Sequence, residues 1–420
     1  MVRRGPGDAV STTEGSNGSE VFTQAVRSTG GGAMTALAQA EFPQPKPKPL
    51  LGNIPDLDPG RTVQSFMRLA REYGPIYKLE LPSGNMIIVS SQELVDELCD
   101  ERRFEKALHP PLLETRDLVA DALFTAETGE ENWGIAHRIL MPAFGPSALR
   151  SMFSGMFDIA EQLMVKWERQ GPGVHIDLAD NATRLTLDTI ALCSFSHRFN
   201  SLYSDDMNPF VAAMVSRLEE SGARTRRPAL QNRLMVLKNR QYDEDKRVMY
   251  AVADQLIEDR RRNPRSEGDR DVLDTLLTAT DPETGQQLSD ENMRYQLITF
   301  LVAGHETTSG LITFTLYELM RHPDVVNKAR EQVESALGGS VPRFEHLAQL
   351  GYLDQILKET LRLWPTAPGF ALRPIEQNTT PRQVISSAPE RRRAGPEPDP
   401  APRPDGVAGS GAVRPRSIHL

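Results

Sequence analysis

The segment Phe300-Leu-Val-Ala-Gly-His-Glu-Thr-Thr-Ser309 lies inside a long run of Ile, Leu, Phe and Val that predicts a helix over residues 295–320. It contains four polar residues in succession, His305, Glu306, Thr307 and Thr308. Burial of such groups in an apolar helix costs free energy unless each one has a hydrogen-bonding partner. Sequences tolerate that cost mainly where the chemistry of the protein requires it. The segment therefore predicts the main core helix and a functional site on it.

Two other classes of protein could contain such a helix. A helix over 295–320 is long enough to cross a bilayer, which would make this a membrane-anchored protein. Glu306 near its midpoint would then cost about 2.5–3.5 kcal/mol, so we expect no membrane partner. His305-Glu306 also begins like the zinc-binding HExxH motif, but position 309 is Ser instead of His, so we expect no metal ion held by side chains here. Each of these four polar residues, taken singly, could also be an ordinary hydrogen-bonded group in a core helix without a functional role.

Two small residues precede the polar group. Ala303 and Gly304 carry little or no side chain, so a flat cofactor and a small ligand could approach the helix backbone beside them. A Thr hydroxyl in such a place can hydrogen-bond dioxygen and relay protons, and an adjacent carboxylate can supply those protons from solvent. Glu306 and the threonines beside it are therefore candidate catalytic residues, with Ala303 and Gly304 as candidate cofactor-binding residues.

The composition is that of a globular protein with polar margins. Hydrophobic residues make up 39% and charged residues 25% of the 420 residues. A net charge of −9 provides no basic field for phosphates, so we expect no nucleic-acid partner. The two cysteines, Cys99 and Cys193, lack CxxC spacing and predict neither a disulfide framework nor a zinc ribbon. No apolar stretch follows Met1-Val-Arg-Arg4, so we expect no signal peptide and a cytoplasmic protein.

The middle of the chain is expected to form an α-dominated α+β domain. Helical periodicity marks residues 63–73, and alternation predicts a hairpin of strands over 75–81 and 84–90. From 130 to 365 the pattern is almost wholly helical. A small N-terminal antiparallel sheet followed by many helices is typical of the α+β class.

The two ends of the chain differ from this middle part. Residues 1–41 are rich in Gly, Ser and Thr, and we expect them to be disordered. After Pro374 the composition shifts to Pro, Arg, Ala and Gly, and we expect residues 375–420 to form a disordered tail. GC-rich DNA translated in a shifted frame produces the same bias, so we interpret the tail as frameshifted after about Arg373. The ordered domain is predicted to cover residues 42–374.

A second motif, Lys358-Glu-Thr-Leu-Arg-Leu-Trp-Pro-Thr-Ala-Pro368, follows the long helix. Together with the 300–309 segment it resembles the cytochrome P-450 haem-thiolate monooxygenases. The resemblance is to the bacterial, often reductase-fused branch that hydroxylates long-chain fatty acids, and it runs from about Phe42 to Pro374. It implies the cytochrome P-450 fold, a haem cofactor on a Cys thiolate, and hydroxylation of a long-chain fatty acid or similar apolar substrate with O2. The electrons would come from NADPH through an FAD- and FMN-containing flavoprotein reductase.

The resemblance places the catalytic threonine at Thr307 and the proton-supplying acid at Glu306, and it implies roles for Phe124 and for two residues of the second motif. Glu359 and Arg362 match the family's Glu-x-x-Arg helix, whose ion pair fixes the haem-side core, although an i,i+3 pair alone is commonplace. Phe124 corresponds to the aromatic residue that sits over the haem and shapes the substrate pocket. These assignments predict one structural pair and one pocket residue.

Three further residues match the family's haem-carboxylate site. Trp133 and His137 lie i,i+4 on one predicted helical face, and they correspond to the helix that donates hydrogen bonds to the haem propionates. Lys106 could add a cation there. Taken singly, a Trp is usually core packing and a His is usually a satisfied group.

Two departures from the family pattern bear on function. The branch has an Arg and a Tyr at the pocket mouth to hold a carboxylate, and this chain has Gly84 and Ile88, so the resemblance implies an apolar pocket without that clamp. The Phe-Gly-x-Gly-x-Arg-x-Cys-x-Gly loop of the iron ligand is not found, and residues 363–420 contain no cysteine. Cys99 and Cys193 lie in helical contexts outside any such loop. By family resemblance we therefore expect a haem-thiolate monooxygenase, although the chain as given lacks the C-terminal part and the thiolate ligand and is expected to be inactive. The alternative is a non-catalytic truncated fragment.

Overall fold

A computed structural model describes residues 42–375, except positions 59, 83, 207, 226 and 228, together with the backbone of 383–387. The described residues divide into two compact units, a sheet unit of residues 42–105 and 369–387 and a helical unit of residues 106–368. The expected disorder of residues 1–41, and of the tail apart from 375 and 383–387, lies outside the described residues.

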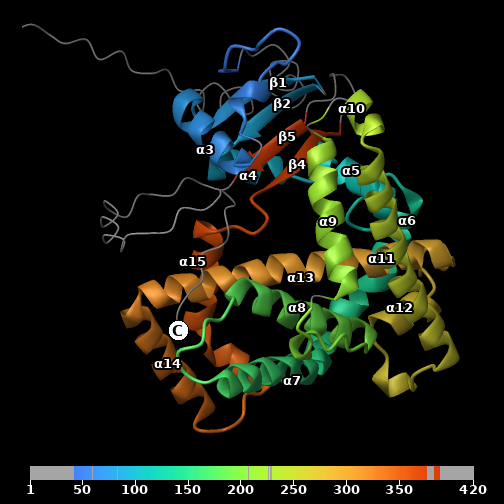
Figure 1. Ribbon diagram of the computed structural model, residues 1–420, viewed down its shortest axis with the longest axis vertical. Helices are drawn as coiled ribbons and strands as arrows, with labels where there is room; N and C mark the ends of the chain where they lie inside the picture. The colour runs from blue at the N-terminus through green and yellow to red at the C-terminus, as the bar shows by residue number, and fades with distance from the viewer. Residues whose placement is uncertain are drawn as a thin grey trace, which may run out of the picture. The chain divides into compact units, whose positions relative to one another are not determined.

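The sheet unit contains a five-stranded sheet with two helices. Its strand order is β1-β2-β5-β4-β3, and Figure 1 shows the early strands beside β4 and β5 from late in the chain. Its elements are η1 (Ile54–Asp56), α3 (Thr62–Tyr73), β1 (Ile76–Leu81), β2 (Gly84–Val89), α4 (Gln92–Leu98), β3 (Phe104–Lys106), β4 (Gly369–Pro374) and β5 (Gln383–Ser387). The predicted helix over 63–73 and the predicted antiparallel hairpin are confirmed.

The sheet differs from the prediction in its membership and in its direction. β5 pairs in parallel with β2, from Met86 opposite Gln383 to Val89 opposite Ser386, and it pairs antiparallel with β4. The sheet is therefore mixed and not purely N-terminal, and the prediction of a disordered tail from 375 onward is wrong for residues 383–387. The short run Gln383-Val-Ile-Ser-Ser387 forms a strand because β2 and β4 present unpaired edges on both sides of it.

The two faces of the sheet are covered by different helices. Strand alternation sends Tyr77, Leu79 and Ile88 to the face that packs on Leu69 of α3. It sends Ile76, Ile87 and Val89 to the other face, which packs on Leu94 and Leu98 of α4. β2 is therefore apolar on both sides, which is typical of an interior strand.

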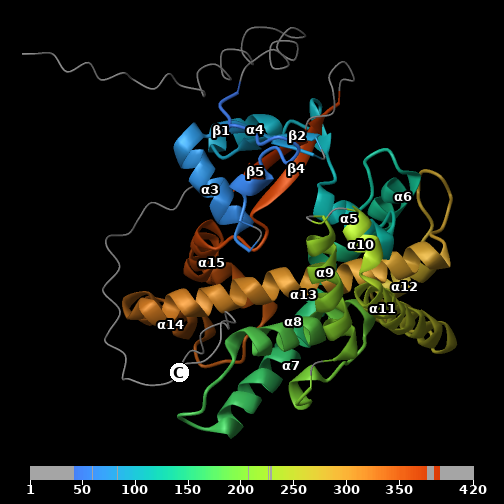
Figure 2. The same cartoon turned by 45° about the horizontal axis from the view of Figure 1, so that its top comes forward.

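The helical unit is built around α13. Figures 1 and 2 show α8 running along α13, with α7 packed against α8. Among the described residues of this unit, the helices are α5 (Pro110–Val119), α6 (Glu131–Leu140), α7 (Pro146–Gln170), α8 (Leu178–Phe195), α9 (Pro209–Arg224), α10 (Ala229–Leu234), α11 (Val236–Arg262), α12 (Val272–Thr278), α13 (Asp290–Arg321), α14 (Pro323–Leu337) and α15 (Gly351–Leu363). Short 3-10 segments are η2 (Met141–Phe144), η3 (Ser201–Tyr203), η4 (Glu267–Asp269) and η5 (Phe344–Gln349).

The predicted long helix is confirmed, but it covers Asp290–Arg321 and therefore begins five residues before the predicted start at residue 295. Ser289 caps α13 by accepting a hydrogen bond from the Asn292 amide at 3.2 Å, and Asp290 and Glu291 follow in the first turn, where carboxylates suit the helix dipole. Pro323 starts α14 directly after His322 and prevents α13 from continuing. In the part of the chain that the structure covers, no helix has both the length and the apolarity needed to span a membrane.

Close packing of α13 on α8 depends on a glycine. A Cβ atom at Gly304 would lie 2.8 Å from Cγ1 of Ile190, closer than side-chain carbon atoms approach. One hydrogen bond also joins the two helices, from Oγ1 of Thr186 to the carbonyl oxygen of His305 at 2.9 Å. Ile190 therefore occupies the space beside Gly304, and the interpretation that Gly304 leaves room for a cofactor is wrong for this residue.

Candidate active site

The polar segment of α13 is divided between two faces of the helix. His305 and Ser309 are buried, 3% and 7% exposed, whereas Glu306, Thr307 and Thr308 are exposed. The expectation that four successive polar residues are buried is therefore wrong for three of them. Successive helical residues are about 100° apart, so four in a row cannot share one buried face.

The exposed face carries the candidate catalytic groups. Ala303, Glu306 and Thr307 stand at i, i+3 and i+4, which places them on one side of α13, and all three are exposed. The Thr307 hydroxyl donates to the Ala303 carbonyl oxygen at 2.9 Å, so its oxygen keeps lone pairs that can accept another hydrogen bond. Glu306 has no ion-pair partner among the described residues. This face therefore combines a small residue, a hydroxyl and a carboxylate open to solvent.

His305 belongs to the other face and has a structural role. Burial lowers the pKa of its imidazole, because the charged form would lose its hydration. Its ring Nδ1 lies 3.4 Å from the Val302 carbonyl oxygen. We therefore expect a neutral, buried ring at pH 7.

Phe124 lies in the segment that joins α5 to α6. Its side chain is 50% exposed. The Lys106 ammonium donates to the carbonyl oxygens of Leu123 and Phe124, at 3.3 and 3.2 Å. The structure therefore gives this predicted haem-carboxylate cation two backbone partners beside the predicted pocket residue.

Polar side chains that the sequence analysis missed connect this segment to α13. The Leu123 amide donates to Oε1 of Gln296 at 3.2 Å, and Gln296 is fully buried in α13. Asn292, one turn earlier, donates to Asp121 at 2.9 Å. Asp121 also accepts from Asn132 of α6 at 2.6 Å. A signal existed in the sequence, because Asn292 and Gln296 are polar residues at i,i+4 in an otherwise apolar helix.

Trp133 and His137 form a pair on α6. Their rings stack with centroids 5.0 Å apart and planes 14° from parallel, so the predicted shared face is confirmed. His137 is exposed and Trp133 is half-buried. The ring N–H groups of Trp133 and His137 therefore belong to a partly open face of α6, where they could donate hydrogen bonds to a carboxylate.

The end of α6 is fixed by the turn that precedes α13. Arg138 makes two hydrogen bonds to Asp281, at 2.6 and 2.8 Å, and the Asp281 side chain is fully buried. The Arg138 guanidinium holds the pKa of the Asp281 carboxyl well below its usual range. Thr284 adds a hydroxyl donor at 2.6 Å, and Gly285 takes a positive φ of 73°. The Asp281-Pro-Glu-Thr-Gly285 motif therefore anchors α6 beside α13.

Glu359 and Arg362 form the predicted ion pair on α15. Two hydrogen bonds of 2.7 and 2.6 Å join them, and Arg362 lowers the pKa of the Glu359 carboxyl. Their side chains are 56% and 44% exposed, so the pair by itself contributes little stability. Trp364 holds the end of α15 instead, because it stacks on Phe314 of α13 at 4.7 Å.

Gly84 and Ile88 stand at the two positions where the resemblance places the residues of a carboxylate clamp. Ile88 is fully buried in the core between β2 and α3, and Gly84 starts β2 with a positive φ of 125°. Neither residue has a group that could bind a carboxylate.

The two cysteines do not fit as iron ligands. Burial raises the pKa of the Cys193 thiol to about 11, and its Sγ donates to the Met152 carbonyl oxygen at 3.5 Å. A thiol with that pKa is protonated at neutral pH, whereas an iron ligand must be a thiolate. Cys99 is exposed at the end of α4 in the sheet unit. The open face of α13 fits a flat cofactor, and the described residues supply no thiolate for it.

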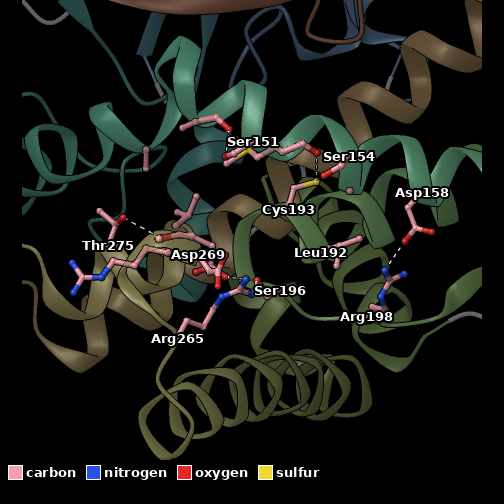
Figure 3. A pocket seen from close by; sticks show the side chains of 18 residues that line it. Ser151, Ser154, Asp158, Leu192, Cys193, Ser196, Arg198, Arg265, Asp269 and Thr275 are labelled. Atoms are coloured by element: carbon pink, nitrogen blue, oxygen red, sulfur yellow. Dashed lines mark hydrogen bonds and ion pairs between the residues drawn. The ribbon is translucent and has the colours of Figure 1, made fainter. Parts of the chain in front are cut away.

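A cavity of about 690 Å³ lies elsewhere in the helical unit, between α7, the end of α8 and residues 265–275 (Figure 3). None of the candidate site residues lines it. Its carboxylates are largely paired, Asp158 with Arg198 at 2.5 Å and Asp271 with Arg260 at 2.7 Å. The cavity therefore has no strong preference for either sign of charge, and we assign it no ligand.

Comparison with known proteins supports the motifs. The family model for cytochrome P450 matches residues 42–383. A self-sufficient cytochrome P450 monooxygenase of Phanerodontia chrysosporium is 47% identical over 80% of this chain and 32% of its own length. The bifunctional cytochrome P450/NADPH–P450 reductase 2 of Bacillus subtilis is 46% identical over 79% of this chain and 31% of its own length. The chain thus spans about a third of the length of these relatives. A family match over residues 42–383, with relatives 46–47% identical over about four fifths of the chain, shows that this chain belongs to the cytochrome P450 family.

Proposed function

We propose that this protein is a haem-dependent monooxygenase that inserts one oxygen atom of O2 into a long-chain fatty acid or a similar apolar substrate. The observation that carries the proposal is the exposed face of α13, where Ala303, Glu306 and Thr307 lie together. The name of the Bacillus subtilis relative supports an NADPH–P450 reductase as the electron source. The family resemblance implies that this flavoprotein carries FAD and FMN. Cysteine usage supports a cytoplasmic location.

Haem, when bound, supplies the iron chemistry that activates dioxygen. The residues of this chain orient it and handle protons. Ala303 leaves room for a flat group on α13. The Thr307 oxygen can accept a proton while its own hydrogen passes on, and Glu306 can reload it from solvent. Phe124 shapes the substrate pocket.

The haem carboxylates would be held at α6. Trp133 and His137 supply two ring N–H donors on one partly open face. Lys106 supplies a cation near the same segment of chain, although the hydrogen bonds of its ammonium go to backbone carbonyls. None of the described residues is a candidate for the iron ligand.

Ile88 is buried and Gly84 has no side chain, so neither residue offers a group that binds a substrate carboxylate. This favours substrates without a carboxylate. We therefore propose that alcohols or hydrocarbons of fatty-acid length bind at least as well as the corresponding acids. This preference follows because a carboxylate would lose its hydration on binding without gaining a partner.

The test uses a fusion protein. Residues 42–374 of this chain are joined to the C-terminal part of the Bacillus subtilis relative, which supplies the cysteine loop of the iron ligand and the reductase. We expect NADPH-dependent hydroxylation of dodecanol. In this fusion, Thr307→Ala should reduce product formed per NADPH by at least about tenfold, because proton delivery fails while electrons still reach oxygen. Product is measured by mass spectrometry and hydrogen peroxide by a coupled assay.

Thr308→Ala is the matched control, since Thr308 is the adjacent exposed residue of α13. It should leave the yield of product within about twofold of the parent fusion. A fusion that binds haem and consumes NADPH but forms no hydroxylated product would contradict the proposed function. Equal yields from the two Thr variants would contradict the role of Thr307.

A further inference from the structure

The backbone next to Phe124 is held from two directions. Lys106 donates from one side to the carbonyl oxygens of Leu123 and Phe124, at 3.3 and 3.2 Å. Gln296 of α13 accepts the hydrogen bond of the Leu123 amide at 3.2 Å. The Leu123 amide and the carbonyl groups of Leu123 and Phe124 are therefore hydrogen-bonded to side chains that lie far away in the sequence.

Gln296 is itself rigidly oriented. It is fully buried, and its Nε2 donates to Oδ1 of Asn292 at 2.9 Å. Nδ2 of Asn292 in turn donates to Asp121 at 2.9 Å. These bonds decide which end of the Gln296 amide is the oxygen, and that oxygen faces the Leu123 amide. A buried amide that is hydrogen-bonded through both its oxygen and its nitrogen can hold a backbone group in one position.

The residue after Phe124 is fixed as well. Thr125 is fully buried, and its hydroxyl donates to the Ala120 carbonyl oxygen at 2.8 Å. Arg116 donates to the Thr125 carbonyl oxygen at 2.6 Å and is paired with Glu130. The half-exposed Phe124 ring thus projects from a backbone that is fixed on both sides of it.

We propose that Lys106 and Gln296 are positioning residues that hold the Phe124 ring in one place and thereby set the width of apolar substrate that the site accepts. The selectivity part rests on the proposed function. A Phe ring has only two side-chain torsions, so its position follows the backbone closely. Release of the backbone lets the ring move aside and admits wider ligands. Lys106 then acts through Phe124 and touches no substrate.

The first experiment measures amide hydrogen exchange of peptides covering residues 121–126 in the purified chain. Lys106→Met keeps the apolar stem and removes the donor, and Gln296→Met removes the acceptor. We expect exchange in this segment to rise about tenfold in each variant, since each change removes a hydrogen bond from it. Lys106→Arg should restore slow exchange, because a guanidinium can also donate to both carbonyls.

Lys358→Met is the matched control. Lys358 is 73% exposed on α15, and its ammonium pairs with Asp354 of the same helix. Its variant should leave exchange of residues 121–126 unchanged. Circular dichroism of every variant checks that the helical content is retained. Exchange at the parent rate in both Lys106→Met and Gln296→Met would overturn the proposal.

The second experiment measures selectivity by displacement of a fluorescent apolar dye, with dodecanol as the narrow probe and pyrene as the wide one. The ratio of the two dissociation constants should shift about tenfold toward pyrene in Lys106→Met and in Gln296→Met. Phe124→Ala should shift it as far. In the Phe124→Ala background, Lys106→Met should add nothing, because its effect passes through the ring.

Additive shifts in the double variant would overturn the positioning role. If neither probe displaces the dye from any variant, the apolar site of the proposed function fails, and the exchange result alone decides whether Lys106 and Gln296 hold the segment. If exchange does not respond, the positioning proposal fails whether or not the probes bind.

Discussion

His305 and Thr307 are two positions apart on α13, and they lie on different faces of the helix. His305 is buried and has a pKa lowered by burial, whereas Thr307 is exposed and its hydroxyl donates to the Ala303 carbonyl oxygen. At the scale of single residues, the direction in which a side chain leaves the helix decides between packing and chemistry.

The buried imidazole predicts a pH dependence of stability. A folded-state pKa below the unfolded value means that the unfolded chain takes up a proton first, so this contribution is present above about pH 6.5 and is lost as the pH falls. His305→Gln should flatten the change of unfolding free energy between pH 7.5 and 5. Urea unfolding at several pH values measures it. A slope that is the same in the variant and the parent would contradict this prediction.

Substitution of Arg184 is expected to lower the stability more than substitution of an exposed charged residue. Its buried guanidinium donates to the carbonyl oxygens of Ser201 and Ser204, each at 2.7 Å, and to Asp180 at 2.8 Å. Arg184→Leu should reduce the unfolding free energy by about 3 kcal/mol, since the buried carbonyls lose their donors. Urea midpoints measure this loss.

Arg262→Leu is the control for that substitution. Arg262 pairs with Glu258 one turn away, and both side chains are more than half exposed. Its loss should change the unfolding free energy by less than about 0.5 kcal/mol. Equal effects of the two changes would show that the 201–206 loop does not depend on Arg184.

At the scale of elements, the pairing of α13 with α8 depends on Gly304. Gly304→Ala should reduce the unfolding free energy by about 1–3 kcal/mol, because the new methyl group would overlap Ile190. Gly351→Ala, at the start of α15, is the control, since an added Cβ there meets nothing within 4 Å. It should be neutral or slightly stabilising. Thermal unfolding compares the two, and a Gly304→Ala variant as stable as the parent would contradict this account.

The sequence predicted most elements and not the full sheet. Periodicity and alternation are local, so α3, β1, β2 and α13 could be recognised from them. β5 could not, because five residues with little apolar character become a strand only between β2 and β4. The same limit applies to the hydrogen bond between Leu123 and Gln296, which joins residues far apart in the chain.

At the scale of the whole molecule, the missing ligand gives a spectroscopic prediction. The chain as given, loaded with haem and reduced under carbon monoxide, should show no red-shifted Soret band of the thiolate type. The reason is that residues 363–420 hold no cysteine and that the Cys193 thiol, with a pKa of about 11, stays protonated. Cys193→Ser should leave the spectrum unchanged. A thiolate-type band that this change abolishes would identify Cys193 as an unexpected ligand.

The sequence by itself determined the family and the long helix with Thr307 and Glu306, because these follow from motifs and periodicities within short stretches. The frameshift interpretation of the tail remains a prediction from composition. Tertiary structure alone decided that Glu306 and Thr307 are exposed while His305 is buried, that Gly304 packs on Ile190, and that Lys106 holds the backbone at Phe124. These outcomes depend on which distant segments meet, and no local pattern contains that information.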